Sequence, residues 1–274
     1  MALSRRRHLG WVTAGVALLA VGLAACGGRS AAGKAQPAAA SQLKPPAALG
    51  GVTLKVPLPA AVAGLPLTTA AGQRTTLAAY RGKIVIIADF LTLCQDMCPM
   101  ISANVAAMAR QIQAAGLAGR VALLEITVDP QRDTPARLTA YQKLFGGKLP
   151  GWTLLRASPA GTAALWKFFH VYYQREPEDK PPGVDWLTGK RLTYDVEHGN
   201  NLIFLSPDGT ERYAVDAAAD TRDALPPGTL VRFLNGQGLT NLYHPAPADS
   251  WTVPQAMQVV SWLAGRKIPA GGSP

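Results

Sequence analysis

The chain has 274 residues, 48% of them hydrophobic, and its 27 lysines and arginines outnumber 17 acidic residues, for a formal net charge of +10. This length predicts one domain of about 200 residues with a single core. Basic and aromatic residues do not cluster as they do in nucleic-acid-binding modules, so nucleic acid is excluded as the expected partner. The basic surplus favours an anionic lipid surface or an acidic partner, and a solvated basic surface explains it equally well.

The first 25 residues have the pattern of an export signal. Three arginines at positions 5–7 precede an apolar run over 11–25, which is shorter than the roughly 20 residues of a comfortable membrane span. The run ends in Leu-Ala-Ala before Cys26 and resembles the bacterial lipobox. That resemblance implies cleavage before Cys26, lipidation of its sulfur, and a location on the outer, extracytoplasmic face of the cell membrane. An uncleaved signal anchor is the alternative.

The mature chain is expected to begin with a tether. Residues 26–51 follow the lipobox with Ala, Gly, Ser and Pro and few large apolar side chains, too few to offset chain entropy. A coil of about 25 residues has an r.m.s. span of roughly 25–30 Å, so the folded part would stay close to the membrane. We therefore predict a signal over 1–25, a lipidated tether over 26–51 and one domain over 52–268.

The domain opens with an alternation of strands and helices. An apolar run over 83–90 predicts a strand covered on both faces. Pro99 suits the first position of a helix, and the apolar spacing of three and four residues continues to Gly116. A second buried strand is expected over 121–128, ended by Asp129 and Pro130, and a helix capped by Thr134 is expected to reach about residue 145.

The later elements complete the predicted fold. A third helix is expected from residue 159 to about 173, a hairpin over 201–206 and 212–215 turns at Pro-Asp-Gly, and a last helix covers 253–263. Strands alternating with helices require right-handed crossovers and parallel pairing, and the hairpin adds antiparallel strands. The prediction is an α/β, thioredoxin-like fold whose central mixed sheet is flanked by helices, with surface insertions over 176–191 and 216–251.

Cys94 and Cys98 lie between the first buried strand and its helix. A helix N-terminus stabilises a thiolate and lowers a cysteine pKa from about 8.5 into a range of roughly 3.5 to 7.5. Spacing of four positions brings the two sulfurs to one side, close enough to chelate one ion or to form a disulfide. An inert structural bridge is the weaker interpretation, because it would close almost no loop.

Several stretches together resemble the Sco/SenC family. The segment from Thr92 to Pro99 is similar to the family signature of two cysteines separated by three residues and followed by proline. Val-Asp-Pro at 128–130, Asp-Thr-Pro at 133–135 and Val-Glu-His at 196–198 match in order, and the likeness spans about residues 52–215. It departs from the pattern at Gln95, where proline is common, and at the two insertions.

The resemblance implies a copper site made of Cys94, Cys98 and His198. Two thiolates and an imidazole suit Cu(I), and Cu(II) is held if further ligands complete the site. His170 falls in an apolar helical stretch and His244 in a proline-rich loop, so neither competes with His198.

Three functions remain open at this stage. The resemblance implies a membrane-tethered copper chaperone that delivers copper to the copper centre of a cytochrome c oxidase subunit during assembly. The same residues, Cys94 and Cys98, also suit the redox pair of a thiol-disulfide oxidoreductase that reduces the acceptor protein's cysteines. A thiol peroxidase with Cys94 as the attacking thiolate is the third possibility.

Overall fold

The computed structural model describes residues 43–47, 49–222, 224–244 and 250–268. The predicted signal over 1–25, the lipidation site Cys26 and most of the tether lie outside the described residues. Within the described part of the chain, no helix has the length and apolar character needed to cross a membrane.

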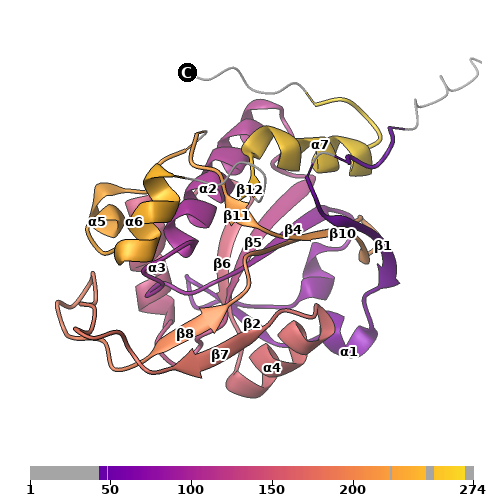
Figure 1. Cartoon of the computed structure of the whole chain (residues 1–274). Coiled ribbons are helices and arrows are strands. Elements are labelled where there is room, and N and C mark those ends of the chain that lie inside the picture. Colours follow the sequence, from indigo (N-terminus) through magenta and orange to yellow (C-terminus); the bar gives the residue numbers. More distant parts are fainter. Residues whose placement is uncertain (1–42, 48, 223, 245–249, 269–274) are drawn as a thin grey trace, which may run out of the picture. The chain divides into compact units, whose positions relative to one another are not determined.

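One mixed sheet of eight strands organises the domain (Figure 1). Its central strands β4, β5 and β6 are parallel, and β9 pairs with β4 in the antiparallel direction. From one edge to the other, the strands are β1 (Val52–Pro57), β10 (Thr210–Asp216), β9 (Asn201–Leu205), β4 (Ile84–Phe90), β5 (Val121–Thr127), β6 (Trp152–Arg156), β2 (Leu67–Thr69) and β3 (Arg74–Thr75).

Strand order decides which face each helix covers. The chain passes from β4 to β5 to β6 in one direction, so right-handed crossovers put α2 (Cys98–Ala114) and α3 (Pro135–Leu144) on the same face. It then returns past β4 to β9, which puts α4 (Pro159–Phe168) on the opposite face, where it contacts α1 (Ala60–Ala63). The last helix, α7 (Val253–Leu263), packs beside α2. A short 3-10 helix covers Leu77–Tyr80.

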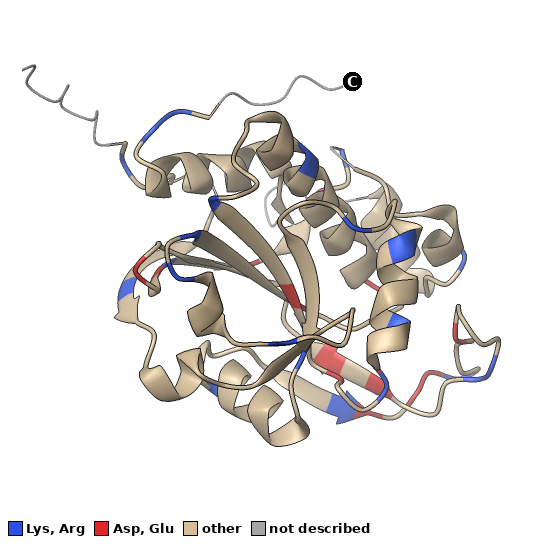
Figure 2. Cartoon of the chain, turned by 180° about the vertical axis from the view of Figure 1, so that it is seen from behind, with Lys and Arg blue, Asp and Glu red and all other residues tan. Residues whose placement is uncertain are grey.

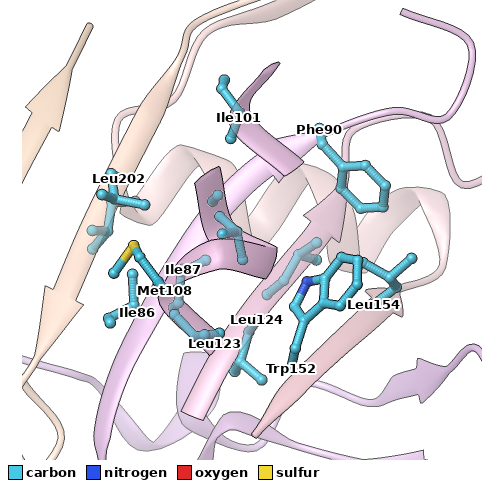
Figure 3. Close-up of a cluster of buried hydrophobic side chains, with 14 of the residues drawn as sticks. Ile86, Ile87, Phe90, Ile101, Met108, Leu123, Leu124, Trp152, Leu154 and Leu202 are labelled. Atoms are coloured by element: carbon cyan, nitrogen blue, oxygen red, sulfur yellow. The ribbon is translucent and has the colours of Figure 1, made fainter. Parts of the chain in front are cut away.

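The core lies between α2 and the central strands. All seven residues of β4 and all seven of β5 are buried, as the apolar runs predict. Figure 3 shows Ile101 and Met108 of α2 among side chains of β4, β5, β6 and β9. Met100 and Met108 of α2 are both 0% exposed and belong to this core.

The α/β class predicted from the sequence is confirmed, and one boundary is wrong. The helix expected from 159 to about 173 ends at Phe168. His170 has a left-handed backbone with φ of 56°, which stops the helix, and Tyr173 already begins a strand. That strand, β7 (Tyr173–Glu176), pairs with β8 (Asp195–His198) in a separate two-stranded ribbon.

The two insertions differ in their secondary structure. Residues 177–194, between β7 and β8, are mostly loop. Residues 216–251 contain α5 (Gly228–Val231), α6 (Gly236–Tyr243) and a parallel pair of short strands, β11 (Ala218–Ala219) and β12 (Ser250–Trp251). Figure 1 shows α5 and α6 beside α2, on the side from which the loop after β7 projects.

Candidate metal centre

The two cysteines are placed by the transition from β4 to α2. The strand ends at Phe90, a loop follows, and Cys98 is the first residue of the helix with Pro99 directly after it. The amide of Cys98 points back at Cys94, with 3.4 Å between the nitrogen and Sγ. Cys94 is partly buried and Cys98 is fully buried, and both thiols are free. The helix N-terminus thus directs an N–H group at a sulfur, as the sequence predicts.

The β7–β8 ribbon carries His198 to the cysteines. His198 ends β8 and pairs with Tyr173 of β7. The ribbon is fixed by Tyr194, whose ring lies 3.7 Å from the guanidinium groups of both Arg132 and Arg175. Arg132 also donates a hydrogen bond of 2.6 Å to the Tyr194 carbonyl. These contacts hold the ribbon against the main sheet.

The three predicted site residues meet in space. His198 Nε2 lies 3.2 Å from Cys98 Sγ, and the donor atoms of Cys94, Cys98 and His198 all lie within 4.8 Å of one another. The structure thus brings together one residue from the loop, one from the helix and one from a strand a hundred positions further along. The other two histidines of the domain, His170 and His244, are exposed at the ends of α4 and α6 and take no part.

Asp89 is a residue of the site that the sequence analysis missed. It is 0% exposed on β4, and its Oδ2 lies 2.7 Å from His198 Nδ1. Its other oxygen accepts a hydrogen bond from the Asn201 amide. A carboxylate on one ring nitrogen orients the imidazole and leaves the other nitrogen free to bind a metal. The sequence does contain a sign of this role, because an acidic residue within the buried run over 84–90 requires a partner.

The electrostatics of the site favour a positively charged His198 imidazolium between the Cys94 sulfur and the Asp89 carboxylate. A hydrogen bond with Cys98, helped by His198, lowers the pKa of Cys94 well below its usual range, although burial opposes this. Burial, reinforced by Cys94, raises the pKa of Cys98. For His198, burial would lower the pKa, but hydrogen bonds with Asp89 and Cys94 outweigh it and raise the pKa to about 10. A thiolate and an imidazolium are therefore favoured side by side.

A buried acid anchors the start of the cysteine loop. Asp133 is 0% exposed, and its carboxylate accepts hydrogen bonds from the hydroxyls of Thr92 and Thr127 and from the Thr92 amide. Burial raises the pKa of Asp133 to about 6. Asp129, expected to end a strand and begin a turn, follows β5 and pairs with Arg132 instead of joining the trio.

The donor set suits a soft metal. Two sulfurs and an imidazole nitrogen converge, and a histidine whose other nitrogen faces a carboxylate is the usual arrangement of a metal-binding histidine. The residues present therefore fit copper.

Comparison with known proteins finds one matching family model and several related chains. The family model described as SCO1/SenC matches residues 61–226. The chain is 32% identical over 151 residues to a protein named SCO2 homolog, mitochondrial, of Bos taurus, covering 54% of this chain and 52% of that protein. It is 29% identical over 143 residues to SCO1 homolog, mitochondrial, of Homo sapiens, covering 52% and 43%. The chain thus spans about half the length of these curated relatives.

One solved structure found by comparison is that of Arabidopsis thaliana ScoI with copper bound. It is 26% identical in sequence, with a TM-score of 0.46, over 57% of this chain and 88% of that one.

Proposed function

Because the chain belongs to the SCO1/SenC family, we propose that it is a copper chaperone that holds copper on Cys94, Cys98 and His198 and delivers it to the copper centre of cytochrome c oxidase. Copper is then the cargo of the protein. The acceptor is inferred from the family resemblance.

The observation that carries the proposal is the convergence of three soft-metal donors. Their atoms lie within 4.8 Å of one another although they come from distant parts of the chain. Thiolates and imidazole together favour Cu(I), and water or a further side chain would be needed to complete a Cu(II) site. Asp89 supports the assignment, because it orients His198 from the ring nitrogen that faces away from the sulfurs.

The surroundings of the site carry the opposite charge from the chain as a whole. Residues 176–197 contain six acidic and three basic residues, in a chain of net charge +10. Figure 2 shows several Asp and Glu residues, with fewer Lys and Arg, on the ribbon and on the loop that joins its two strands. A negative local field attracts a cation or the basic surface of a partner.

A lipid anchor at Cys26 is part of the proposal. The lipobox-like sequence supports it, and the tether over 26–51 would let the domain reach an acceptor in the membrane. We expect the wild-type chain to sediment with membranes and a Cys26→Ser variant to lose most of that association. Equal sedimentation of the two would contradict lipid attachment at this residue.

The second candidate is a thiol-disulfide oxidoreductase that reduces the acceptor's cysteines. The free thiols of Cys94 and Cys98, with Cys94 partly accessible, favour it. His198 separates the two functions, because disulfide exchange does not need a third metal ligand. In cells whose only copy is His198→Ala, we expect cytochrome c oxidase activity to fall to the level of the deletion. Full activity would favour the reductase.

Copper binding itself is tested through Cys98. A Cys98→Ser variant is expected to lose tight Cu(I) binding, because the hydroxyl of serine is a poor ligand for this ion. Retention of one tightly bound Cu(I) would contradict the ligand set.

A further inference from the structure

The turn between the two cysteines is where this chain departs from the family pattern. Gln95 stands where proline is common, and its side chain is only 6% exposed. A buried glutamine needs partners for its amide. The first insertion supplies a partner for this amide and the second insertion bonds the main-chain carbonyl of Gln95, so the departure in the turn and the two insertions belong to one feature.

The first insertion holds the side chain of Gln95. Its Nε2 donates a 3.0 Å hydrogen bond to Glu178 Oε1, and the same oxygen accepts from the amide of Gly183 at 3.1 Å. A Cβ atom at Gly183 would lie 2.1 Å from Gln95 Oε1, so a side chain at this position would displace the Gln95 amide. Trp186 donates a further hydrogen bond, 2.7 Å long, to the carbonyl of Thr92.

The second insertion holds the same turn from another side. The amide of Asn235 donates to the carbonyl of Gln95 at 2.9 Å, and Asn241 Nδ2 donates to Asp96 Oδ1 at 2.5 Å. A Cβ atom at Gly238 would lie 2.3 Å from the Gln95 carbonyl oxygen and 3.1 Å from Asp96 Cα. Asn235 also caps α6 by accepting from the Gly238 amide. The start of α6 is therefore packed directly on the turn.

These contacts restrict how the cysteines can move. A disulfide requires a separation of about 2.05 Å between the sulfurs, whereas both cysteines are free here. Cys98 is 0% exposed in the first turn of α2. Closure of the bond therefore depends on a movement of Cys94, which is joined directly to the turn that both insertions hold.

We propose that the two insertions form a two-sided clamp on Gln95 and Asp96, which opposes closure of Cys94 and Cys98 to a disulfide and keeps both thiols available. That the clamp regulates a metal site rests on the proposed function. Gln95 and Asn241 are its positioning residues. The opposed step is ordinary exchange: Cys94 or Cys98 attacks oxidised glutathione, one glutathione leaves, and the second cysteine displaces the other, so that two thiols lose two protons and two electrons.

The test measures the oxidation rate of the metal-free, reduced chain by oxidised glutathione. All variants carry Cys26→Ser, which leaves Cys94 and Cys98 as the only cysteines. Gln95→Ala removes a side-chain hydrogen bond to the first insertion, and Asn241→Ala removes one from the second insertion. We expect each to speed disulfide formation by about tenfold, the effect of losing a hydrogen bond of about 1.4 kcal/mol. The equilibrium share of disulfide in a fixed glutathione buffer should rise in the same direction.

Thr240→Ala is the matched control. Thr240 is exposed on α6 beside Asn241, and its hydroxyl bonds within its own helix to the Gly236 carbonyl. It should leave the rate within about twofold, less than the loss of one hydrogen bond. Because a general loosening of the fold would also speed oxidation, thermal unfolding is measured for each variant. The clamp predicts faster oxidation at a temperature where every variant is still fully folded.

Unchanged rates in both clamp variants, or a rise in Thr240→Ala equal to theirs, would overturn the proposal. Because the assay contains no copper, it succeeds or fails independently of Cu(I) binding.

Discussion

Two buried acids on neighbouring strands are used in opposite ways. Asp89 on β4 and Glu125 on β5 are both 0% exposed. In the parallel register Ala88 pairs with Glu125 and Asp89 with Ile126, so the two carboxyl groups point to opposite faces of the sheet. Asp89 faces an ionisable partner, His198, whereas Glu125 faces Ser102 and Trp152, whose donors are neutral.

The comparison shows that the partner, more than burial, marks a functional acid. Burial raises the pKa of Glu125 to about 7, because hydrogen bonds of 2.6 Å from Ser102 and Trp152 do not replace a counter-charge. Asp89 instead helps to raise the pKa of His198 and sets the direction of its ring. Ionisation of Glu125 destabilises the fold, whereas Asp89 organises the metal site.

The largest effect expected from this comparison is on pH-dependent stability. Glu125 ionises near pH 4.5 when unfolded and near pH 7 when folded, so the folded state keeps the proton longer and stability falls as pH rises through this window. The loss amounts to about 3 kcal/mol. Glu125→Gln, which imitates the protonated acid, should come within about 1 kcal/mol of wild type at pH 5 and exceed it by about 3 kcal/mol at pH 8.

Chemical denaturation of both proteins from pH 5 to pH 8 measures this difference. Every other titrating group is common to the two proteins and cancels from their difference. Parallel stability curves would show that Glu125 is ionised in the fold and that the contrast with Asp89 is wrong.

The next effect is on copper affinity. Asp89→Asn keeps the shape of the side chain but removes the charge that orients His198, and changes of this kind raise a metal Kd by about 10- to 100-fold. Glu125→Gln is the matched control and should change the Kd by less than about twofold, because it lies on the other face of the sheet. Competition titration with a Cu(I) chelator compares the two. Equal losses would mean that both acids act only through the fold.

The smallest effect is expected from Ser102. Its hydroxyl donates to Glu125 and accepts from Tyr141 at 3.1 Å. Ser102→Ala should cost about 1 kcal/mol of unfolding free energy and leave Cu(I) affinity unchanged. A large loss of affinity in a stable variant would show that the two sides of the sheet are coupled, and the contrast between the acids would need revision.

Local patterns were enough to predict the scaffold of the site. The apolar runs that became β4 and β5, and the Pro99-led helix that became α2, place Cys94 and Cys98 at a helix start without knowledge of any distant contact. His198 needed more, since only the resemblance linked it to residues a hundred positions away. The structure brings its imidazole to the sulfurs through the β7–β8 ribbon.

What the sequence could not provide were contacts made between distant segments. The helix predicted to reach about 173 stops at Phe168 because Tyr173 pairs with His198, and such pairing leaves little trace in local periodicity. In the sequence, Gln95 is only a departure from the family pattern, yet Glu178 and Asn235 bond to it from segments 83 and 140 positions later. Long-range pairing of this kind overrides local propensity.

The central claim is that Cys94, Cys98 and His198 together hold copper, and its most direct test is a Cu(I) titration. The reduced Cys26→Ser chain is titrated with Cu(I) against a competing chelator, in parallel with the same chain carrying His198→Ala. We expect one tightly bound Cu(I) per chain and a collapse of that affinity in the variant. Weak binding that is the same with and without His198 would contradict the three-ligand site and leave the cysteines as a redox pair.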